Sequence, residues 1–157
     1  MTLHFRELAS EDIALCTTWM AGSEPWKTLG FTAARCERAL QREGLEKWLA
    51  VGEDGTPVGF ALLNFSGAFV GYLQLLCVAA EHRDKGVGSA LLTFVEAHVF
   101  ARHANFFLCV SDFNVGAQRL YARHGFTVVG RLDDYLLPGH VELLLRKTRG
   151  PILPPTA

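Results

Sequence analysis

The spacing of hydrophobic positions changes several times along the chain, and each change marks a predicted element. The apolar run from Tyr72 to Val78 is typical of a strand that is covered on both faces. Beyond Gly88 the apolar residues recur three and four positions apart, which predicts an amphipathic helix that ends near His103. This strand and helix are the longest clear signals, and the segment between them is short and glycine-rich.

The remaining elements follow from strand-like alternation or helical spacing. Strands are predicted at 3–7, 46–51, 58–64, 106–110, 126–130 and 141–145, and helices from Ser10 to Met20, from Thr32 to just before Gly44, and from Asn114 to His124. Ser10 and Thr32 are the expected N-caps of the first two helices. The elements indicate one α/β domain over residues 1–148, followed by a mobile, proline-rich tail at 149–157.

Composition narrows the class of protein. A chain of 157 residues that is 50% hydrophobic and 20% charged is typical of one compact domain. The net charge of −1 does not favour nucleic acid or an anionic membrane as partner. The N-terminus lacks a signal peptide's apolar core, so a cytoplasmic location is expected. The scattered Cys16, Cys36, Cys77 and Cys109 are interpreted as reduced thiols, and the histidine spacing predicts no metal site.

The segment Arg83-Asp84-Lys85-Gly86-Val87-Gly88 joins the predicted strand to its helix. Two glycines at the start of a helix allow a tight turn in which several N–H groups point the same way. The helix dipole and the two basic residues add positive potential, so the pattern predicts an anion-binding turn. The alternative is an ordinary connection whose glycines serve packing. The segment matches neither the P-loop nor the G-x-G-x-x-G motif.

A second motif lies downstream, where residues 114–126 read N-x-x-A-x-x-L-Y-x-x-x-G-F. Asn114 stands at a helix start, where its side chain either caps the helix or points at a ligand. Tyr121 is either a partly buried core aromatic or a site residue. Spacing alone leaves both alternatives open.

The pattern R-x-x-G-x-G followed by this second motif resembles the signatures of the GNAT (Gcn5-related) N-acetyltransferases. The order of elements matches as well, so the resemblance covers nearly the whole chain. It implies a mixed, mostly antiparallel sheet of about seven strands, splayed between the fourth and fifth strands and flanked by four helices. The last two strands are expected to pair as a hairpin, or to exchange with the partner subunit of a homodimer.

The resemblance also implies acetyl-CoA as cosubstrate, without a metal. The pyrophosphate would be bound mainly by backbone N–H groups of Arg83, Asp84, Lys85, Gly86, Val87, Gly88 and Ser89. Leu76, Cys77 and Val78 would pair with the pantetheine arm like an added strand, and Asn114 would hydrogen-bond to it. As catalytic groups, the Val78 N–H would polarise the thioester carbonyl and Tyr121 would protonate the departing thiolate.

The acceptor is expected to be a small-molecule primary amine or a peptide N-terminus. The residues expected near it are Glu24, Trp26, Tyr72, Gln74 and Tyr135. Residues 131–135 also resemble the ribosomal-protein alanine acetyltransferases. The sequence departs from the family at the general base, because neither Tyr72 nor Cys109 is a carboxylate where relatives carry one.

Glu24, Asp134 and His140 are the alternative candidates for the base, although each is also a plausible solvated loop residue. Because a carboxylate is missing at the positions of Tyr72 and Cys109, a non-catalytic acyl-CoA sensor is the alternative function. A nucleotide-binding regulator that uses the same loop is a third.

Overall fold

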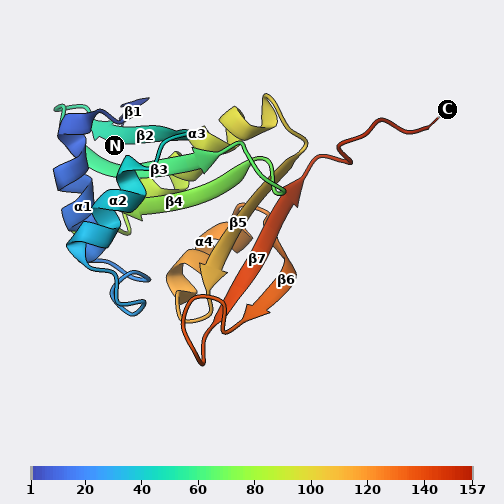
Figure 1. Cartoon of the computed structure of the whole chain (residues 1–157). Coiled ribbons are helices and arrows are strands. Elements are labelled where there is room, and N and C mark those ends of the chain that lie inside the picture. Colours follow the sequence, from blue (N-terminus) through green and yellow to red (C-terminus); the bar gives the residue numbers. More distant parts are fainter. Residues whose placement is uncertain (1, 157) are drawn as a thin grey trace.

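The computed structural model describes residues 2–156, which form seven strands and four α-helices. The elements are β1 (Leu3–Glu7), α1 (Ile13–Ala21), α2 (Ala33–Gln41), β2 (Leu45–Gly52), β3 (Pro57–Asn64), β4 (Tyr72–Val78), α3 (Val87–Phe100), β5 (Asn105–Ser111), α4 (Val115–Arg123), β6 (Thr127–Asp133) and β7 (Val141–Thr148). Every predicted element is present, with ends shifted by a few residues. Residues 149–156 contain neither helix nor strand and project from the domain (Figure 1), and their mobility stays a prediction.

The strands form one sheet in the order β1-β2-β3-β4-β5-β7-β6. Neighbouring strands are antiparallel except β4 and β5, which run parallel. The last two strands pair as a hairpin within the chain. The expected mixed, mostly antiparallel sheet is therefore confirmed.

The sheet divides between β4 and β5. These strands pair at only two positions, Tyr72 with Phe107 and Leu73 with Leu108, beside a hydrogen bond of 2.8 Å from the Phe107 N–H to the Gly71 carbonyl. Beyond Leu73 no pairing between them is formed in residues 2–156, and Figure 1 shows the strands diverging toward their carboxyl ends. The predicted splay is confirmed.

Two hydrophobic clusters cover the two faces of the sheet. Helices α1 and α2 pack over one face through Cys16, Met20, Cys36 and Leu40, which contact Phe60 and Leu62 of β3. Helices α3 and α4 contribute to the other cluster, which holds Leu91, Val95 and Tyr121 together with Phe106 and Leu108 of β5. Within residues 2–156, no helix is long and apolar enough to cross a bilayer.

A bulge in β4 changes which face its side chains meet. Opposite β3, Leu62 pairs with Leu75 but Leu63 pairs with Leu73, so Gln74 is the extra residue. Leu73 therefore joins the α3 cluster, whereas Leu75 and Cys77 join the α1–α2 cluster. Because of the bulge, the side chains in the second half of β4, beside the splay, face the opposite side of the sheet from the one that regular alternation would give them.

The expected cap at Ser10 is wrong. The chain makes a short 3-10 turn at Ser10–Asp12, and Asp12 performs the capping by accepting a 2.8 Å hydrogen bond from the Ala9 N–H. The same carboxylate binds Arg6 through two bonds of 2.7 and 2.9 Å. The carboxylate reaches back three residues, as the acidic residue of a capping box does, whereas an N-cap at Ser10 would have accepted an N–H two or three residues further on. The Thr32 cap is confirmed, because its hydroxyl accepts a hydrogen bond from the Arg35 N–H at 3.2 Å.

Candidate active site

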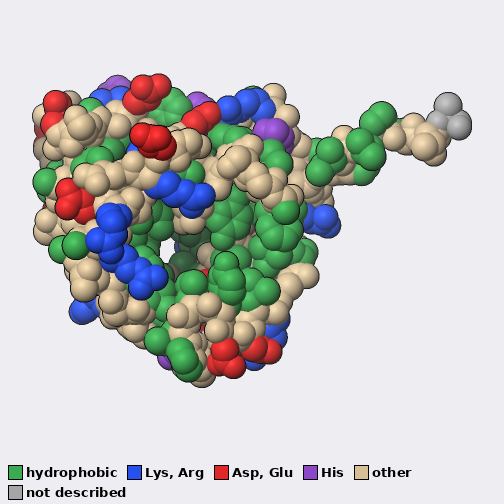
Figure 2. Space-filling view, viewed as in Figure 1, with side chains coloured by type: hydrophobic (Ala, Val, Ile, Leu, Met, Phe, Trp, Pro, Cys, Tyr) green, Lys and Arg blue, Asp and Glu red, His purple; other side chains and the backbone are tan. Residues whose placement is uncertain are grey.

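A cleft of about 740 Å³ occupies the gap between β4 and β5. Figure 2 shows the hollow between the two halves of the molecule, with Lys and Arg side chains on one rim and hydrophobic side chains on the other. All but four of the residues predicted from the sequence border this cleft. The exceptions are Lys85, Val87, Asp134 and His140.

The start of α3 forms one end of the cleft. Gly86 has φ = 84° and precedes the helix, and no side chain in residues 2–156 caps it. The first helical hydrogen bond runs from the Ala90 N–H to the Gly86 carbonyl at 3.0 Å, so the N–H groups of residues 87–89 are left without helical partners. Free N–H donors at the positive end of a helix fit a phosphate group.

The side chains of this loop are not all free for an anion. The Arg83 guanidinium donates to the Ser23 hydroxyl and, at 3.3 Å, to the Val78 carbonyl, which ties the loop to the α1–α2 segment. The Ser89 hydroxyl lies 2.6 Å from Nε2 of His124 at the end of α4. Lys85 is exposed, and the Val87 side chain is buried in the core. The backbone N–H groups, more than the side chains, are therefore the groups of this loop that are available to an anion.

Three elements meet at Gly88. A Cβ at this position would lie 3.5 Å from Cδ2 of Leu120 in α4 and 3.6 Å from Cγ2 of Val78 in β4. A larger side chain would therefore occupy the space where the helix start, the strand end and α4 converge. The small residue keeps the start of α3 close to the splayed end of β4.

The splayed edge of β4 carries unpaired backbone groups. The Ala79 N–H donates to the Val58 carbonyl at 3.0 Å, which shows which N–H groups of β4 point toward β3. Because bonding alternates along an antiparallel ladder, the N–H groups of Leu76 and Val78 point away from β3 and into the gap. The Cys77 side chain faces the opposite cluster and is buried, and burial raises the pKa of its thiol to about 11. Leu76 and Val78 thus present the strand edge that was expected to bind an extended arm.

Tyr121 borders the cleft from the α4 side. It is buried and packs edge-on against Phe126, with ring centroids 5.9 Å apart. Burial raises the pKa of its phenol, so the hydroxyl stays protonated at neutral pH. Asn114 caps α4, since its Oδ1 accepts a hydrogen bond from the Ala117 N–H at 3.3 Å. This hydrogen bond uses only the oxygen of the amide, and Asn114 also borders the cleft.

The expected acceptor residues differ in their surroundings. Trp26 lies in the core, 6% exposed, and also borders the cleft. Gln74 sits at the bulge and accepts a 3.5 Å hydrogen bond from Arg42. Tyr72 is half-buried, and burial raises the pKa of its phenol. Tyr135, 64% exposed, stands at the outer rim.

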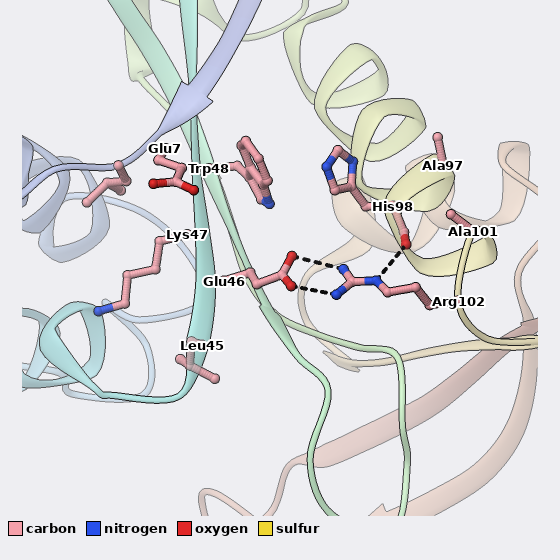
Figure 3. Close-up of a pocket in the computed structure, with 10 residues that line it drawn as sticks. Glu7, Leu45, Glu46, Lys47, Trp48, Ala97, His98, Ala101 and Arg102 are labelled. Atoms are coloured by element: carbon pink, nitrogen blue, oxygen red, sulfur yellow. Dashed lines mark hydrogen bonds and ion pairs between the residues drawn. The ribbon is translucent and has the colours of Figure 1, made fainter.

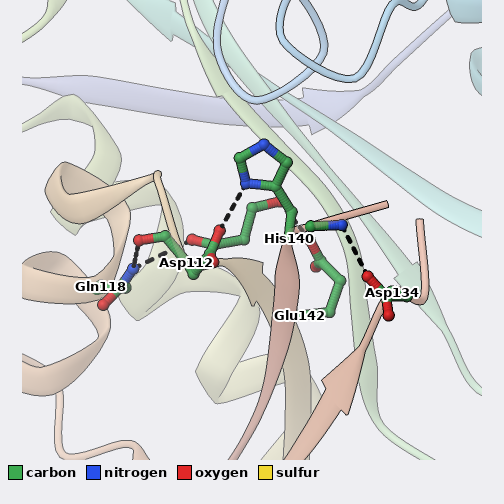
Figure 4. Close-up of polar contacts among 7 residues, drawn as sticks. Asp112, Gln118, Asp134, His140 and Glu142 are labelled. Atoms are coloured by element: carbon green, nitrogen blue, oxygen red, sulfur yellow. Dashed lines mark hydrogen bonds and ion pairs between the residues drawn. The ribbon is translucent and has the colours of Figure 1, made fainter. Parts of the chain in front are cut away.

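The three predicted base candidates are occupied by local contacts. Oε2 of Glu24 accepts the Thr28 N–H at 3.1 Å on the surface. Oδ1 of Asp134 accepts the Gly139 N–H at 2.7 Å, and Nδ1 of His140 lies 3.2 Å from Oδ1 of Asp112 (Figure 4). These contacts stabilise loops, and neither Asp134 nor His140 lines the cleft.

Sequence reasoning missed the buried carboxylate of the cleft wall, Glu142. It lies on β7 directly opposite Ser111 of β5, is 6% exposed, and accepts a hydrogen bond from the Ser111 hydroxyl. Burial raises the pKa of this carboxyl group. The available signal was a lone Glu in the otherwise apolar strand 141–145.

A second cavity of about 780 Å³ lies between β2 and the end of α3. Figure 3 shows Trp48 and His98 beside it, with Arg102 bound to both oxygens of Glu46 at 2.6 and 3.0 Å. It holds none of the residues predicted for the site. The splayed cleft is therefore the candidate active site.

The sheet splits beside a helix start that has no side-chain cap in residues 2–156, and Tyr121 and the edge of β4 face the same cleft. This is the acetyltransferase fold that the two motifs predicted. Residues 10–126 match the model of the acetyltransferase (GNAT) family. The chain belongs to that family.

Solved structures show the same fold. A GNAT-family acetyltransferase from Desulfovibrio desulfuricans, itself of unproven activity, is 21% identical, with 94% of this chain and 99% of that chain covered and a TM-score of 0.77. The ribosomal-protein-S18-alanine N-acetyltransferase of Escherichia coli is 16% identical, with 94% of both chains covered and a TM-score of 0.77. An aminoglycoside 6'-N-acetyltransferase complexed with coenzyme A is 16% identical, with coverage of 98% and 99% and a TM-score of 0.72. No curated protein matches the sequence.

Proposed function

We propose that this protein transfers the acetyl group of acetyl-CoA to a primary amine by direct attack of the amine on the thioester. The observation that carries the proposal is the single cleft that joins three features: free N–H groups at the start of α3, the unpaired edge of β4, and Tyr121. Family membership supports the reaction class. The cytoplasmic location and the homodimer stay predictions.

The residues of the cleft fit acetyl-CoA from end to end. The N–H groups of residues 87–89 would bind the pyrophosphate, with Lys85 and Arg83 adding positive charge nearby. Leu76 and Val78 would pair through their backbones with the amide groups of pantetheine, and the Asn114 NH₂ would donate to the same arm. The cosubstrate supplies the activated acetyl group.

Two groups of the chain would act on the reacting atoms. The Val78 N–H, held by the β3–β4 ladder, donates to the thioester oxygen as negative charge grows there, and a fixed donor lowers the barrier without reorganisation. The Tyr121 hydroxyl gives its proton to the departing sulfur. Its raised pKa keeps it a donor and not an acceptor at neutral pH.

The sensor alternative rested on the lack of a carboxylate where relatives carry one. Glu142 is a carboxylate in the cleft wall at another position, which supports catalysis over the sensor, and the amine panel below separates the two functions. The nucleotide regulator predicts competition by ATP but not by CoA for binding at the α3 start.

The test is a panel of amines incubated with acetyl-CoA, with release of the CoA thiol as readout. The panel should include aminoglycosides, polyamines, amino acids and peptides with different N-termini. Turnover that requires both an amine and the enzyme is expected for at least one class. Tight binding of acetyl-CoA without amine-dependent release across the panel would favour the sensor.

A further inference from the structure

Glu142 is a buried carboxylate without a cation. No Lys, Arg or His in residues 2–156 forms an ion pair with it, and the Ser111 hydroxyl is its hydrogen-bond donor. An isolated buried charge is costly, so such a group usually has a partner or a function. Because Glu142 borders the cleft, a bound molecule can reach it.

Strand alternation fixes the face on which Glu142 stands. Phe106, Leu108 and Val110 of β5 belong to the α3–α4 cluster, so Cys109 and Ser111 face the other side of the sheet. Ser111 lies directly opposite Glu142, and residues opposite each other on antiparallel strands share a face. Tyr121 borders the cleft from the α3–α4 side, and Glu142 borders it from the opposite side.

The ionisable groups around Glu142 come from several elements. Asp112 follows β5, Cys109 lies on β5, and Tyr72 belongs to β4; Tyr135 of the β6–β7 loop is a neighbour of Tyr72. On β6 the neighbour opposite Glu142 is the uncharged Leu132. Burial chiefly raises the pKa of Glu142, the Ser111 hydrogen bond lowers it, and the negative charge of Asp112 raises it. His140, which does not line the cleft, is paired with Asp112.

We propose that Glu142 binds the protonated amine of the acceptor and accepts its proton before attack, which makes cationic primary alkylamines the substrate class. This proposal rests on the proposed function. It adds the base that the sequence lacked at the positions of Tyr72 and Cys109.

The proton balance is complete. An alkylammonium gives one proton to the Glu142 carboxylate, which becomes a carboxylic acid. The freed lone pair on nitrogen forms the C–N bond to the acetyl carbon, and the C–S bond breaks. Tyr121 gives its proton to the sulfur and regains one from the nitrogen, and Glu142 later releases its proton to water. The products are the amide, the CoA thiol and one proton.

The test uses E142Q, which keeps the size of the side chain and its ability to accept the Ser111 hydrogen bond. Two acceptors of one skeleton are compared, an alkylamine that is protonated at pH 7 and a β-fluorinated analogue that is neutral there. The control variant, D133N, makes the same carboxylate-to-amide change on β6 at an exposed residue that pairs with Arg131.

For the protonated amine, kcat/KM of E142Q should fall about 10²-fold or more at pH 7, as expected for loss of a general base. The deficit should shrink as pH rises toward the pKa of the amine, because the neutral amine needs no base. The fluorinated acceptor should lose much less, and D133N should resemble wild type with both. Equal losses for the two acceptors, or a deficit that does not change with pH, would overturn the base role.

Folding is checked by stability and by a second variant. A carboxyl group whose pKa is raised by folding makes the fold less stable as pH rises through that pKa, so E142Q should be at least as stable as wild type at pH 7. Ser111→Ala keeps the carboxylate but removes its donor, so the acid limb of kcat/KM should move to higher pH. An acid limb that does not move in Ser111→Ala would contradict the assignment. A wild type without amine-dependent turnover refutes the proposed function, whereas full turnover by E142Q refutes only the base.

Discussion

Gly71 directly precedes β4, at the end where β4 and β5 are still joined, and its replacement by alanine tests the packing of that junction. Its φ is +83°, and a Cβ there would lie 2.6 Å from the Asn105 carbonyl oxygen and 2.9 Å from Cγ1 of Val99. The Asn105 oxygen belongs to the backbone of β5 and cannot rotate away. Gly67 in the same turn is a matched control, with φ = +90° and nothing within 4 Å of its Cβ position.

The two substitutions share one cost and differ in another. Placing alanine at a left-handed φ lowers the free energy of unfolding by about 1–2 kcal/mol, and the lower entropy of the unfolded chain raises it by about 0.4–1 kcal/mol. Gly71→Ala adds a steric cost of about 1–3 kcal/mol, the usual range for overpacking a core. The free energy of unfolding of Gly71→Ala should therefore be lower than that of Gly67→Ala by about 1–3 kcal/mol.

Thermal unfolding followed by circular dichroism measures this difference. For a chain of this size, 1 kcal/mol corresponds to about 2–4 °C in Tm, so Gly71→Ala should melt about 2–12 °C below Gly67→Ala. Urea titration should give the same order with unchanged m-values. Equal melting temperatures would refute the close contact between Gly71 and β5, and with it the tight junction at the base of the cleft.

Three further predictions concern the site and its support. Tyr121→Phe should lower the single-turnover rate about 10²-fold while CoA affinity stays nearly constant, and an unchanged rate would remove the acid role. Titration calorimetry should show much weaker binding of dephosphorylated pantetheine than of CoA, whereas equal affinities would refute phosphate binding at residues 83–89. Asp12→Ala should destabilise the fold by about 1–3 kcal/mol at pH 7, because Arg6 and the Ala9 N–H lose their acceptor. Arg6 lowers the pKa of Asp12 in the folded protein. The stabilisation that Asp12 provides is therefore present above the ordinary Asp pKa and is lost as pH falls through the lowered pKa. If urea titrations show that Asp12→Ala and wild type still differ in stability at low pH, the prediction is contradicted.

The sequence was sufficient for the elements and for the location of the cleft. Hydrophobic spacing is a local signal, and it identified the β4 strand and the α3 helix on either side of the glycine-rich turn. The two motifs then located both walls of the cleft, including Tyr121 and Asn114. Each motif is a continuous run of the chain, so its resemblance to the family could point to these residues although spacing alone left their roles open.

Features that depend on pairing between distant segments were not predictable in this way. The bulge at Gln74 exists only relative to β3, and the engagement of Arg83 by Ser23 joins segments 60 residues apart. The Arg6–Asp12 pair joins β1 to the turn before α1, and no local pattern marks it. The position of Glu142 in the cleft wall depends on the β5–β7 register, which no local pattern in the sequence encodes.

That register also explains how a carboxylate can reach the cleft although Cys109 is not one. Cys109 lies opposite Leu144 and Ser111 lies opposite Glu142, so Cys109 and Glu142 are diagonal neighbours on one face of the β5–β7 pair. Diagonal neighbours on an antiparallel pair lie about 7–8 Å apart, which is within the reach of a long side chain. A Glu on β7 can therefore serve the same space as a carboxylate on β5. Under the proposal, the β5–β7 register lets Glu142 act from β7 on the space that a carboxylate at position 109 of β5 would reach.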